Sequence, residues 1–360
     1  MNSGPLMEVE NLTVSFPSRR GELRAVIGVS YSLYPQQTLA IVGESGSGKT
    51  VSCRALMGLL PQAAVVTGSV RFGGAELLGL TDDAMRRHRG TNLAMVFQDP
   101  SRSLNPTMKV GNQIAEAVRV HRRVSKAEAR EQAIELLRLV HIPVPGRRFH
   151  EYPHQLSGGM RQRIMIAIAL ACRPKLLIAD EATTALDVTT QAQIMELLLE
   201  LRAELGMTLM LISHDLGLAR SCADEVIVMY AGQIVEQAST PQLFTQVRMP
   251  YTEALFEAIP RLERPAHSPL PVIGGRPPDL SALPAGCSFA PRCRRAADDC
   301  RTTAPPLAEH EPGHRWACWH PVGHEGSGGM APPEGTEVSS RARLPQAPRR
   351  GGSRSPRRRA

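Results

Sequence analysis

Short runs in which hydrophobic and polar residues alternate fill the first part of the chain. "MEVENLTVSF" and "RAVIGVSYSL" repeat with a period of two, which predicts β-strands within residues 7–42. "TLAIV" at 38–42 is apolar after its first residue, as expected for a buried strand. After the glycine-rich segment 43–50, "VSCRALMGLL" has a helical pattern that stops at Pro61. The order strand, glycine-rich loop, helix is therefore predicted here.

The segment 100–155 has the spacing of amphipathic helices. Ser125 and Glu128 are placed as a capping box at the start of one helix. Apolar residues then recur three or four positions apart and form a single stripe that consists of Ala129, Ala133, Leu136, Leu137 and Val140. This region is therefore predicted to be mostly helical.

Strands alternate with helices in the next part of the chain. "KLLIADE" and "MTLMLISHD" are predicted strands on either side of a helix from about 188 to 205, which ends at Gly206. "EVIVMYAGQIVEQ" is a predicted hairpin that turns at Ala231–Gly232. This alternation predicts an α/β fold with a mostly parallel sheet covered on both faces. Prolines multiply after about Pro241, which predicts a smaller appendage over 242–324.

Composition and charge exclude several classes of protein. The chain has 360 residues, of which 42% are hydrophobic, enough for a sizeable core. Apolar runs such as 164–172 are shorter than the roughly 20 residues of a membrane-spanning helix. The first residues lack the pattern of a secretory signal, so we expect a cytoplasmic protein with reduced thiols. The net charge of +8 arises from the last twenty residues, which hold eight arginines and no acid. We therefore expect a disordered tail over 325–360 and no nucleic-acid partner.

The segment Gly43–Thr50 matches the phosphate-loop pattern G-x-x-x-x-G-K-[ST] in its required context. Glycines let backbone N–H groups curve around phosphate oxygens, and the following helix directs its positive end at them. Lys49 is expected to reach the β- and γ-phosphates, and the Thr50 hydroxyl is expected to bind Mg²⁺. The residues predicted to surround ATP here are Gly43, Ser45, Gly46, Gly48, Lys49 and Thr50.

Two adjacent acids follow a predicted buried strand. "LLIAD" brings Asp180 to the strand end, where its carboxylate is expected to hold the Mg²⁺ shell directly or through water. Glu181 is expected to polarise the attacking water as a general base. Either acid alone would more often be a helix cap or a surface charge. The pair, downstream of a phosphate loop, predicts hydrolysis of ATP.

The segment "QLSGGMRQR" at 155–163 resembles the signature of the ABC (ATP-binding cassette) ATPases. The resemblance implies that Gln98 is the Q-loop glutamine, which contacts the metal and supports catalysis, and that His214 is the switch histidine. It also implies that Ala185–Asp187 is the D-loop, with Asp187 at the nucleotide site. Phe16 stands about where this family places an aromatic ring against adenine, and an ordinary core phenylalanine is the competing interpretation.

The signature also implies that the chain needs a partner. Ser157, followed by Gly158 and Gly159, is predicted to cap a helix and leave an N-terminus suited to an anion. In the ABC family this end meets the γ-phosphate held by the opposite cassette. One phosphate loop and one signature cannot complete both composite sites, so a second homologous ATPase subunit, in a heterodimer, is expected.

A closer resemblance is to the ATP-binding subunits of bacterial oligopeptide and dipeptide importers. "FQDPSRSLNP" (97–106), the segment 152–188, "MPYTEALFEAIPR" (249–261) and "GCSFAPRC" all resemble that group, and the similarity covers about 7–321. It implies a RecA-like core, an antiparallel β subdomain and a helical subdomain. Ala182 departs from the group's usual proline after the catalytic glutamate, and Gln36–Gln37 replace its usual Gly-Glu.

The resemblance implies an energy-coupling ATPase for peptide import. The domains are expected at 7–241, with the helical subdomain at about 100–165, and at 242–324 for a C-terminal appendage. The expected partners are two transmembrane permease subunits and, indirectly, an extracytoplasmic substrate-binding protein. The expected place is the cytoplasmic face of the inner membrane. The alternatives are an importer of this class for nickel, glutathione or another small solute, a non-transport ABC ATPase, and a module that binds ATP without hydrolysing it.

Four of the seven cysteines lie within 32 residues near the end of the chain. Cys287, Cys293, Cys300 and Cys318 have five, six and 17 residues between them, whereas structural zinc usually shows close C-x₂₋₄-C pairs. Disulfides are disfavoured in a reducing cytoplasm. Four thiolates suit an iron–sulfur cluster or zinc, and free thiols are the third possibility. Some importer ATPases that this chain resembles carry a [4Fe–4S] cluster in the matching segment, which favours the cluster.

Overall fold

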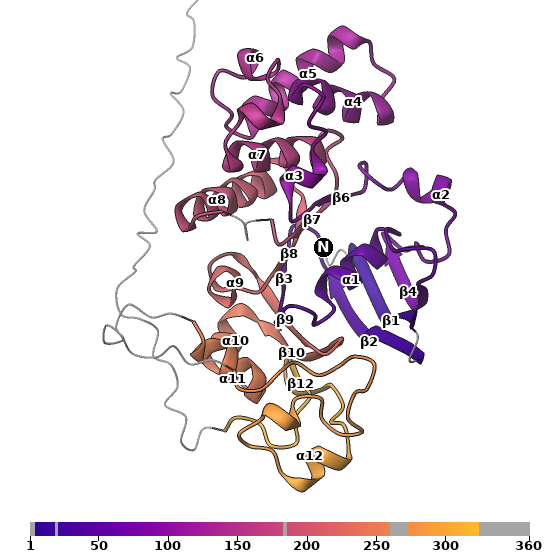
Figure 1. The fold of residues 1–360 in the computed structure, drawn as a ribbon, viewed down its shortest axis with the longest axis vertical. Coiled ribbons are helices and arrows are strands. Elements are labelled where there is room, and N and C mark those ends of the chain that lie inside the picture. Colours follow the sequence, from indigo (N-terminus) through magenta and orange to yellow (C-terminus); the bar gives the residue numbers. More distant parts are fainter. Residues whose placement is uncertain (1–3, 19–20, 183–185, 260–272, 324–360) are drawn as a thin grey trace, which may run out of the picture.

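Two β-sheets organise the computed structural model, which describes residues 4–18, 21–182, 186–259 and 273–323. The strands are β1 (Met7–Ser18), β2 (Gly21–Leu33), β3 (Thr38–Val42), β4 (Val65–Phe72), β5 (Ala75–Glu76), β6 (Leu93–Val96), β7 (Leu176–Asp180), β8 (Thr208–Ser213), β9 (Glu225–Tyr230), β10 (Gln233–Ser239), β11 (Ala308–Glu311) and β12 (His314–Trp316). The smaller sheet is antiparallel, in the order β2-β1-β4-β5. The larger has the order β11-β12-β10-β9-β3-β8-β7-β6 (Figure 1). The predicted tail at 325–360 lies outside the described residues.

Helices surround the larger sheet and connect its strands. They are α1 (Lys49–Leu56), α2 (Asp82–Arg86), α3 (Pro100–Ser103), α4 (Val110–His121), α5 (Lys126–Leu139), α6 (Pro145–Arg148), α7 (Gly158–Ala169), α8 (Val188–Leu205), α9 (Leu216–Cys222), α10 (Thr240–Thr245), α11 (Pro250–Glu257) and α12 (Asp298–Thr302), with 3₁₀ turns at Pro153–Gln155 and Ala290–Arg292. The helices α3 to α7 gather at one end of the molecule (Figure 1). In the part of the chain that the structure describes, no helix is both long and apolar enough to cross a bilayer.

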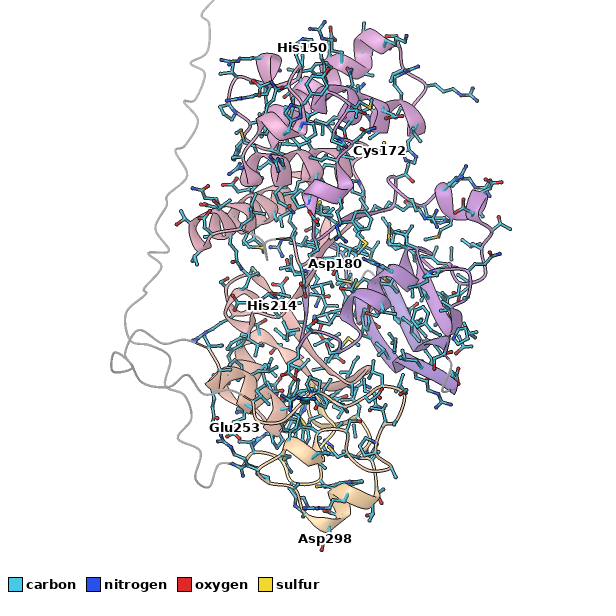
Figure 2. The ribbon with its side chains drawn as sticks, viewed as in Figure 1. His150, Cys172, Asp180, His214, Glu253 and Asp298 are labelled. Atoms are coloured by element: carbon cyan, nitrogen blue, oxygen red, sulfur yellow. The ribbon has the colours of Figure 1, made fainter. Side chains whose placement is uncertain are left out.

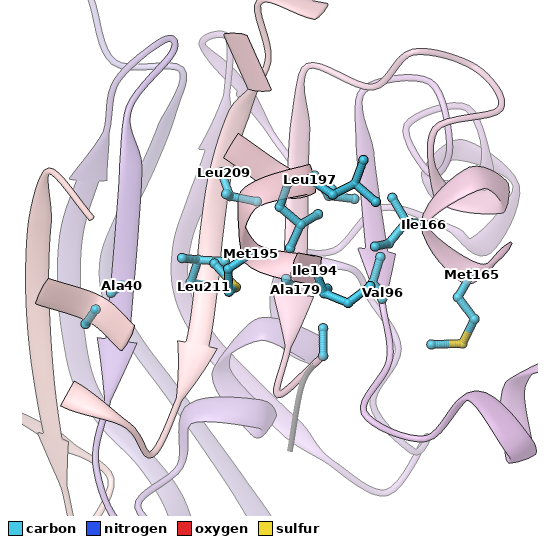
Figure 3. Close-up of a cluster of buried hydrophobic side chains, with 14 of the residues drawn as sticks. Ala40, Val96, Met165, Ile166, Ala179, Ile194, Met195, Leu197, Leu209 and Leu211 are labelled. Carbon is cyan, nitrogen blue, oxygen red and sulfur yellow. The ribbon is translucent and has the colours of Figure 1, made fainter. Parts of the chain in front are cut away.

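The parallel strands β6, β7, β8, β3 and β9 form the centre of the larger sheet. Their residues alternate between two cores, so that Leu177 and Ala179 face one side while Leu176 and Ile178 face the other. Figure 3 shows the first side, where Ile166 of α7 and Leu197 of α8 pack against the strands. The smaller sheet and α1 contribute to the core on the second side. Burial on both faces explains why these strands are mostly apolar.

The segment after residue 241 shares the larger sheet. Strand β12 pairs with β10 through Glu236↔Trp316, and β11 pairs with β12. Glu236 is fully buried and accepts hydrogen bonds from the backbone N–H groups of Arg248 and Met249, at 2.7 and 3.2 Å, while His314 Nε2 lies 2.9 Å from its Oε1. The division of the chain at 241/242 stays a prediction, but the two segments are joined by strand pairing and a buried polar cluster.

Candidate functional site

The loop between β3 and α1 has the backbone of a phosphate loop. Gly43 has φ 151°, and a Cβ there would lie 2.2 Å from the carbonyl oxygen of Met229. Gly48 caps α1 in the left-handed conformation, and a Cβ on it would lie 2.5 Å from the carbonyl oxygen of Ala25. Only glycine fits at these two positions, because a side chain would meet backbone and not a movable group. The loop therefore sits directly against β9 and β2, which hold its shape.

Lys49 lies inside this loop with 4% of its surface exposed. Its Nζ donates to the carbonyl oxygens of Gly43 at 2.7 Å and Glu44 at 2.9 Å. Burial lowers the pKa of Lys49, and the nearby carboxylates of Glu181 and Asp180 oppose that effect. The ammonium group is thus held at the centre of the loop, where phosphate oxygens can take the place of the carbonyl partners.

The two acids predicted from the sequence stand at the end of β7. The hydroxyl of Thr50 donates to Oδ1 of Asp180 at 2.8 Å, which brings the first turn of α1 to the strand end. Asp180 is 1% exposed, and burial raises its pKa. A hydroxyl and a carboxylate are oxygen ligands of the kind Mg²⁺ prefers, and a nearby cation would relieve the cost of burying the charge. These two residues fit a magnesium site.

Gln98 and Glu181 come together across neighbouring strands. Gln98 follows β6, and its Nε2 donates to Oε2 of Glu181 at 2.7 Å. Strands β6, β7 and β8 are parallel neighbours, so the residues that follow them share one edge of the sheet. His214 follows β8 at this edge and is exposed to solvent, and Figure 2 shows it near Asp180 in the middle of the molecule. The edge therefore combines a candidate magnesium site, a candidate general base and two polar side chains, those of Gln98 and His214.

The predicted signature residues lie at the start of α7. Ser157 is the N-cap, and its hydroxyl accepts from the backbone N–H of Met160 at 3.3 Å. Ser157 and Gly158 are exposed, and a Cβ on Gly159 would lie 2.7 Å from the Thr190 side chain of α8. Helix α7 lies among the helices in the upper part of Figure 1, apart from α1. An open, positive helix end is thus available to a second molecule.

Asp187 and Phe16, which were also predicted to lie at the nucleotide site, are found at the start of α8 and on β1. Asp187 caps α8, where its Oδ1 accepts from the backbone N–H of Thr190 at 2.9 Å, and Ala185 of the predicted D-loop lies outside the described residues. Phe16 lies on β1, half-buried against the core beneath the smaller sheet. The role of Phe16 beside adenine stays a prediction.

The four clustered cysteines line one cavity. It is bounded by Cys287, Cys293, Cys300, Cys318, Phe289, Met249, Trp319 and His320 among others. All four are free thiols. Burial raises the pKa of Cys287 and Cys293, and it raises the pKa of Cys318 to about 12. Burial disfavours the thiolate form of these cysteines, and neighbouring thiolates would also repel one another. A bound metal ion would offset both costs, because it stabilises the thiolates as ligands.

Two residues of this cavity wall, Cys300 and His320, belong to a smaller group that sequence reasoning missed. Atoms of Asp299, Cys300 and His320 lie within 4.8 Å of one another, and His320 Nε2 is 2.9 Å from Asp299 Oδ1. Within the described ranges, no three of the clustered cysteines lie that close together. His320 is two residues beyond Cys318, and that proximity was the one local signal for it.

Comparisons with known proteins agree with this geometry. Residues 26–184 match the family described as ABC transporter, and 235–300 match the oligopeptide/dipeptide transporter C-terminal region. A probable peptide ABC transporter ATP-binding protein of Sinorhizobium fredii, y4tR, is 50% identical over 325 residues, which cover 89% of this chain and 97% of the relative. The oligopeptide transport ATP-binding protein OppD of Escherichia coli is 47% identical over 317 residues, which cover 88% and 94%.

A solved structure extends the likeness to three dimensions. The dimeric ATP-binding cassette MJ0796, in a post-hydrolysis state with ADP and phosphate, superposes with a TM-score of 0.59 at 28% identity. The match covers 65% of this chain and 98% of that one. The chain belongs to the ABC transporter family, as one of its ATP-hydrolysing subunits with a C-terminal region of the oligopeptide/dipeptide transporter type.

Proposed function

We propose that the chain hydrolyses ATP to drive the import of peptides through a membrane permease to which it docks from the cytoplasmic side. The observation that carries the proposal is the pairing of hydrolytic groups, Thr50 with Asp180 and Gln98 with Glu181, in a chain whose later part matches the oligopeptide/dipeptide C-terminal region. The relatives named for peptide transport support the choice of peptides.

The residues divide the work of hydrolysis. Lys49 and the N–H groups of the phosphate loop bind the β- and γ-phosphates, and Thr50 with Asp180 would hold Mg²⁺, which neutralises charge on the phosphate oxygens. Glu181 orients the attacking water and accepts its proton. Gln98 holds the Glu181 carboxylate in place and would contact the same ion. His214, which follows β8 at the same edge of the sheet, would contact the γ-phosphate.

A second cassette completes the site in this proposal. The exposed N-terminus of α7, with Ser157 and Gly158, supplies positive dipole and N–H groups to the γ-phosphate bound by the partner. The partner is an identical or homologous cassette, and two permease subunits and a substrate-binding protein complete the transporter. The chain alone is then expected to be mostly monomeric and to turn over ATP slowly.

Reconstitution tests this function. The chain is purified through an affinity tag from solubilised membranes, and the proteins that accompany it are identified and reconstituted in vesicles. We expect permease subunits and a second cassette, and ATP turnover that rises when peptide-loaded binding protein is added. If nickel or glutathione stimulated ATP turnover and peptides did not, the transported molecule would be one of those solutes and not a peptide. Full substrate-coupled activity from the isolated chain would overturn the assembly.

We also propose that Cys287, Cys293, Cys300 and Cys318 hold a [4Fe–4S] cluster. A single zinc ion with Zn–S bonds of about 2.3 Å brings its sulfur ligands within about 4 Å of one another. In the described residues the four thiols line one cavity, yet no three of them lie within 4.8 Å of one another. A four-iron cluster binds each thiolate to a different iron and therefore needs a wider spacing. When bound, the cluster would tie together a segment that is rich in proline.

Metal content separates the possibilities. Protein purified without oxygen is expected to be brown, to contain iron and acid-labile sulfide in equal amounts, and to lose both with Cys293→Ser. Colourless protein that contains one equivalent of zinc would show that the site binds zinc and not an iron–sulfur cluster. Zinc that is lost with His320→Ala and kept with Cys293→Ser would assign it to Asp299, Cys300 and His320.

A further inference from the structure

An arginine of the cysteine-rich segment, which runs from Cys287 to Cys318, contacts the phosphate loop. Arg292 directly precedes Cys293, and its guanidinium forms a bidentate ion pair with Glu44, the second residue of the loop, at 2.6 and 2.9 Å. Arg292 also donates to the Tyr230 hydroxyl at 3.2 Å and to the carbonyl oxygens of Gly274 at 2.8 Å and Ile273 at 3.3 Å. The Arg292 side chain is 4% exposed. These hydrogen bonds fix the position of the Arg292 guanidinium, and the bidentate pair with Glu44 adds a defined geometry.

A second contact holds the same loop residue. The backbone N–H of Glu44 donates to the hydroxyl of Tyr251, in α11, at 2.8 Å. The rings of Tyr251, Tyr230 and Phe289 pack together with centroids 4.5 to 5.3 Å apart. Phe289 also lines the cysteine cavity. Glu44 is thus bound through its backbone and its side chain to a block that continues into the cysteine-rich segment.

We propose that Arg292 is a positioning residue for the phosphate loop, which makes the affinity for ATP dependent on the cysteine-rich segment. Glu44 places a negative charge in a loop that must receive the negative phosphates of ATP. Arg292 neutralises that charge and fixes the backbone conformation that the loop needs before ATP arrives. Without it, the bare carboxylate repels the phosphates and the loop loses its anchor. Arg292 would have this role whichever molecule is transported.

Nucleotide affinity measures this role directly. Arg292→Gln in the full chain is expected to weaken MgATP binding about tenfold, the effect of losing a charge-assisted hydrogen-bonded pair. Arg292→Lys keeps the charge without the bidentate geometry. Its affinity for MgATP is expected to lie between those of the wild type and Arg292→Gln. Arg295→Gln is the matched control, because Arg295 lies in the same segment, and its weaker pair is with Glu253 at 3.7 Å. It should leave the dissociation constant for MgATP unchanged.

A double substitution separates positioning from loss of the fold. Arg292→Gln leaves the Glu44 charge unpaired and also removes the anchor, and the unpaired charge is expected to do most of the harm. Adding Glu44→Gln removes that charge and is therefore expected to restore ATP affinity to within about threefold of the wild type. A general disruption of the segment would not be rescued in this way. A double variant that binds as weakly as Arg292→Gln, or single Arg292 variants with the wild-type dissociation constant, would overturn the proposal. Circular dichroism confirms which variants are folded, and Arg292→Lys provides the comparison if Arg292→Gln is not.

The coupling is also measurable in the opposite direction. Linkage between two sites is reciprocal, so MgATP must in turn stabilise the cysteine-rich segment. Amide hydrogen exchange across 286–302 is expected to slow when MgATP is added to the wild type and to respond less in Arg292→Gln. If the exchange rate in the wild type did not change when MgATP was added, the coupling between ATP binding and the cysteine-rich segment would be contradicted.

Discussion

Glu181 is held in an unusual backbone conformation at the site of chemistry. Its φ is 45°, in the left-handed region that residues other than glycine rarely adopt. Its backbone N–H donates to the carbonyl oxygen of Ile212 at 3.0 Å, and its side chain meets Gln98. Strained residues of this kind persist where their surroundings hold them firmly, which is a common feature of active sites. In this conformation the Glu181 carboxylate accepts the hydrogen bond from Gln98, which follows β6.

Replacing this carboxylate separates binding of ATP from its hydrolysis. Glu181→Gln is expected to bind MgATP, because Lys49, Thr50 and Asp180 remain, and to lose about 10²–10⁴-fold in turnover as the general base is lost. Turnover is measured as phosphate release by the assembled complex, and binding by nucleotide titration. Glu204→Gln, at an exposed position on α8, is the control and should behave as wild type. Near wild-type hydrolysis by Glu181→Gln would show that another group is the base.

At the scale of single elements, α5 shows how a local pattern determines a helix. The Ser125 hydroxyl accepts from the backbone N–H of Glu128 at 3.2 Å, and Glu128 accepts from that of Ser125 at 2.7 Å. The hydrogen bond from the Ser125 backbone lowers the pKa of Glu128 below its usual 4.5. Both groups act across three residues, and the buried side chains Ala129, Ala133 and Leu137 follow at helical spacing. The helix is thus specified by its own sequence.

The capping box predicts a dependence of stability on pH. A carboxylate with a lowered folded-state pKa stabilises the fold above its unfolded value, and that stabilisation is lost as the pH falls through the folded value. The difference in melting temperature between the wild type and Glu128→Gln should therefore be constant near pH 7 and shrink below about pH 4.5. Ser125→Ala is expected to cost about 1 kcal/mol at neutral pH. A difference that stays unchanged down to pH 3 would contradict the role of Glu128.

At the scale of the whole molecule, the C-terminal segment after residue 241 adds strands β11 and β12 to the larger sheet. Strand β12 covers the edge of β10, and His314 supplies a buried partner to Glu236. The Arg248 side chain, itself mostly buried, joins Glu311 and the carbonyl oxygen of Val322 at 3.2 Å. Because these contacts cross from one segment to the other, we expect them to unfold as one unit.

Truncation tests this unity. A chain that ends at residue 259 leaves the edge of β10 unpaired and Glu236 without His314, so we expect it to lose at least about 3 kcal/mol of stability and to aggregate. A chain that ends at residue 323 keeps every contact described here and should match the full chain in melting temperature and ATP affinity. If the shorter chain melted at the wild-type temperature, the C-terminal segment would be an independent attachment.

Much of the site follows from local sequence. The phosphate loop, the acid pair after an apolar strand, and the cap at Ser157 each depend on residues within one turn or one strand end. The predicted helix of 188–205 ends at Gly206 in the left-handed conformation, and the predicted hairpin turns at Ala231–Gly232. These features could be predicted from the sequence because they depend on backbone conformation and capping hydrogen bonds between near neighbours in the chain.

Other features were decided by the tertiary structure alone. The pair of Arg292 with Glu44 joins residues 248 positions apart, and the bond from Gln98 to Glu181 spans 83. Strands β11 and β12 have four and three residues, too short for an alternating pattern to mark them, and they exist because β10 offers an edge. No period or turn signal connects such distant groups. The sequence by itself therefore determined the chemistry and the elements that carry it, while folding decided which of them meet.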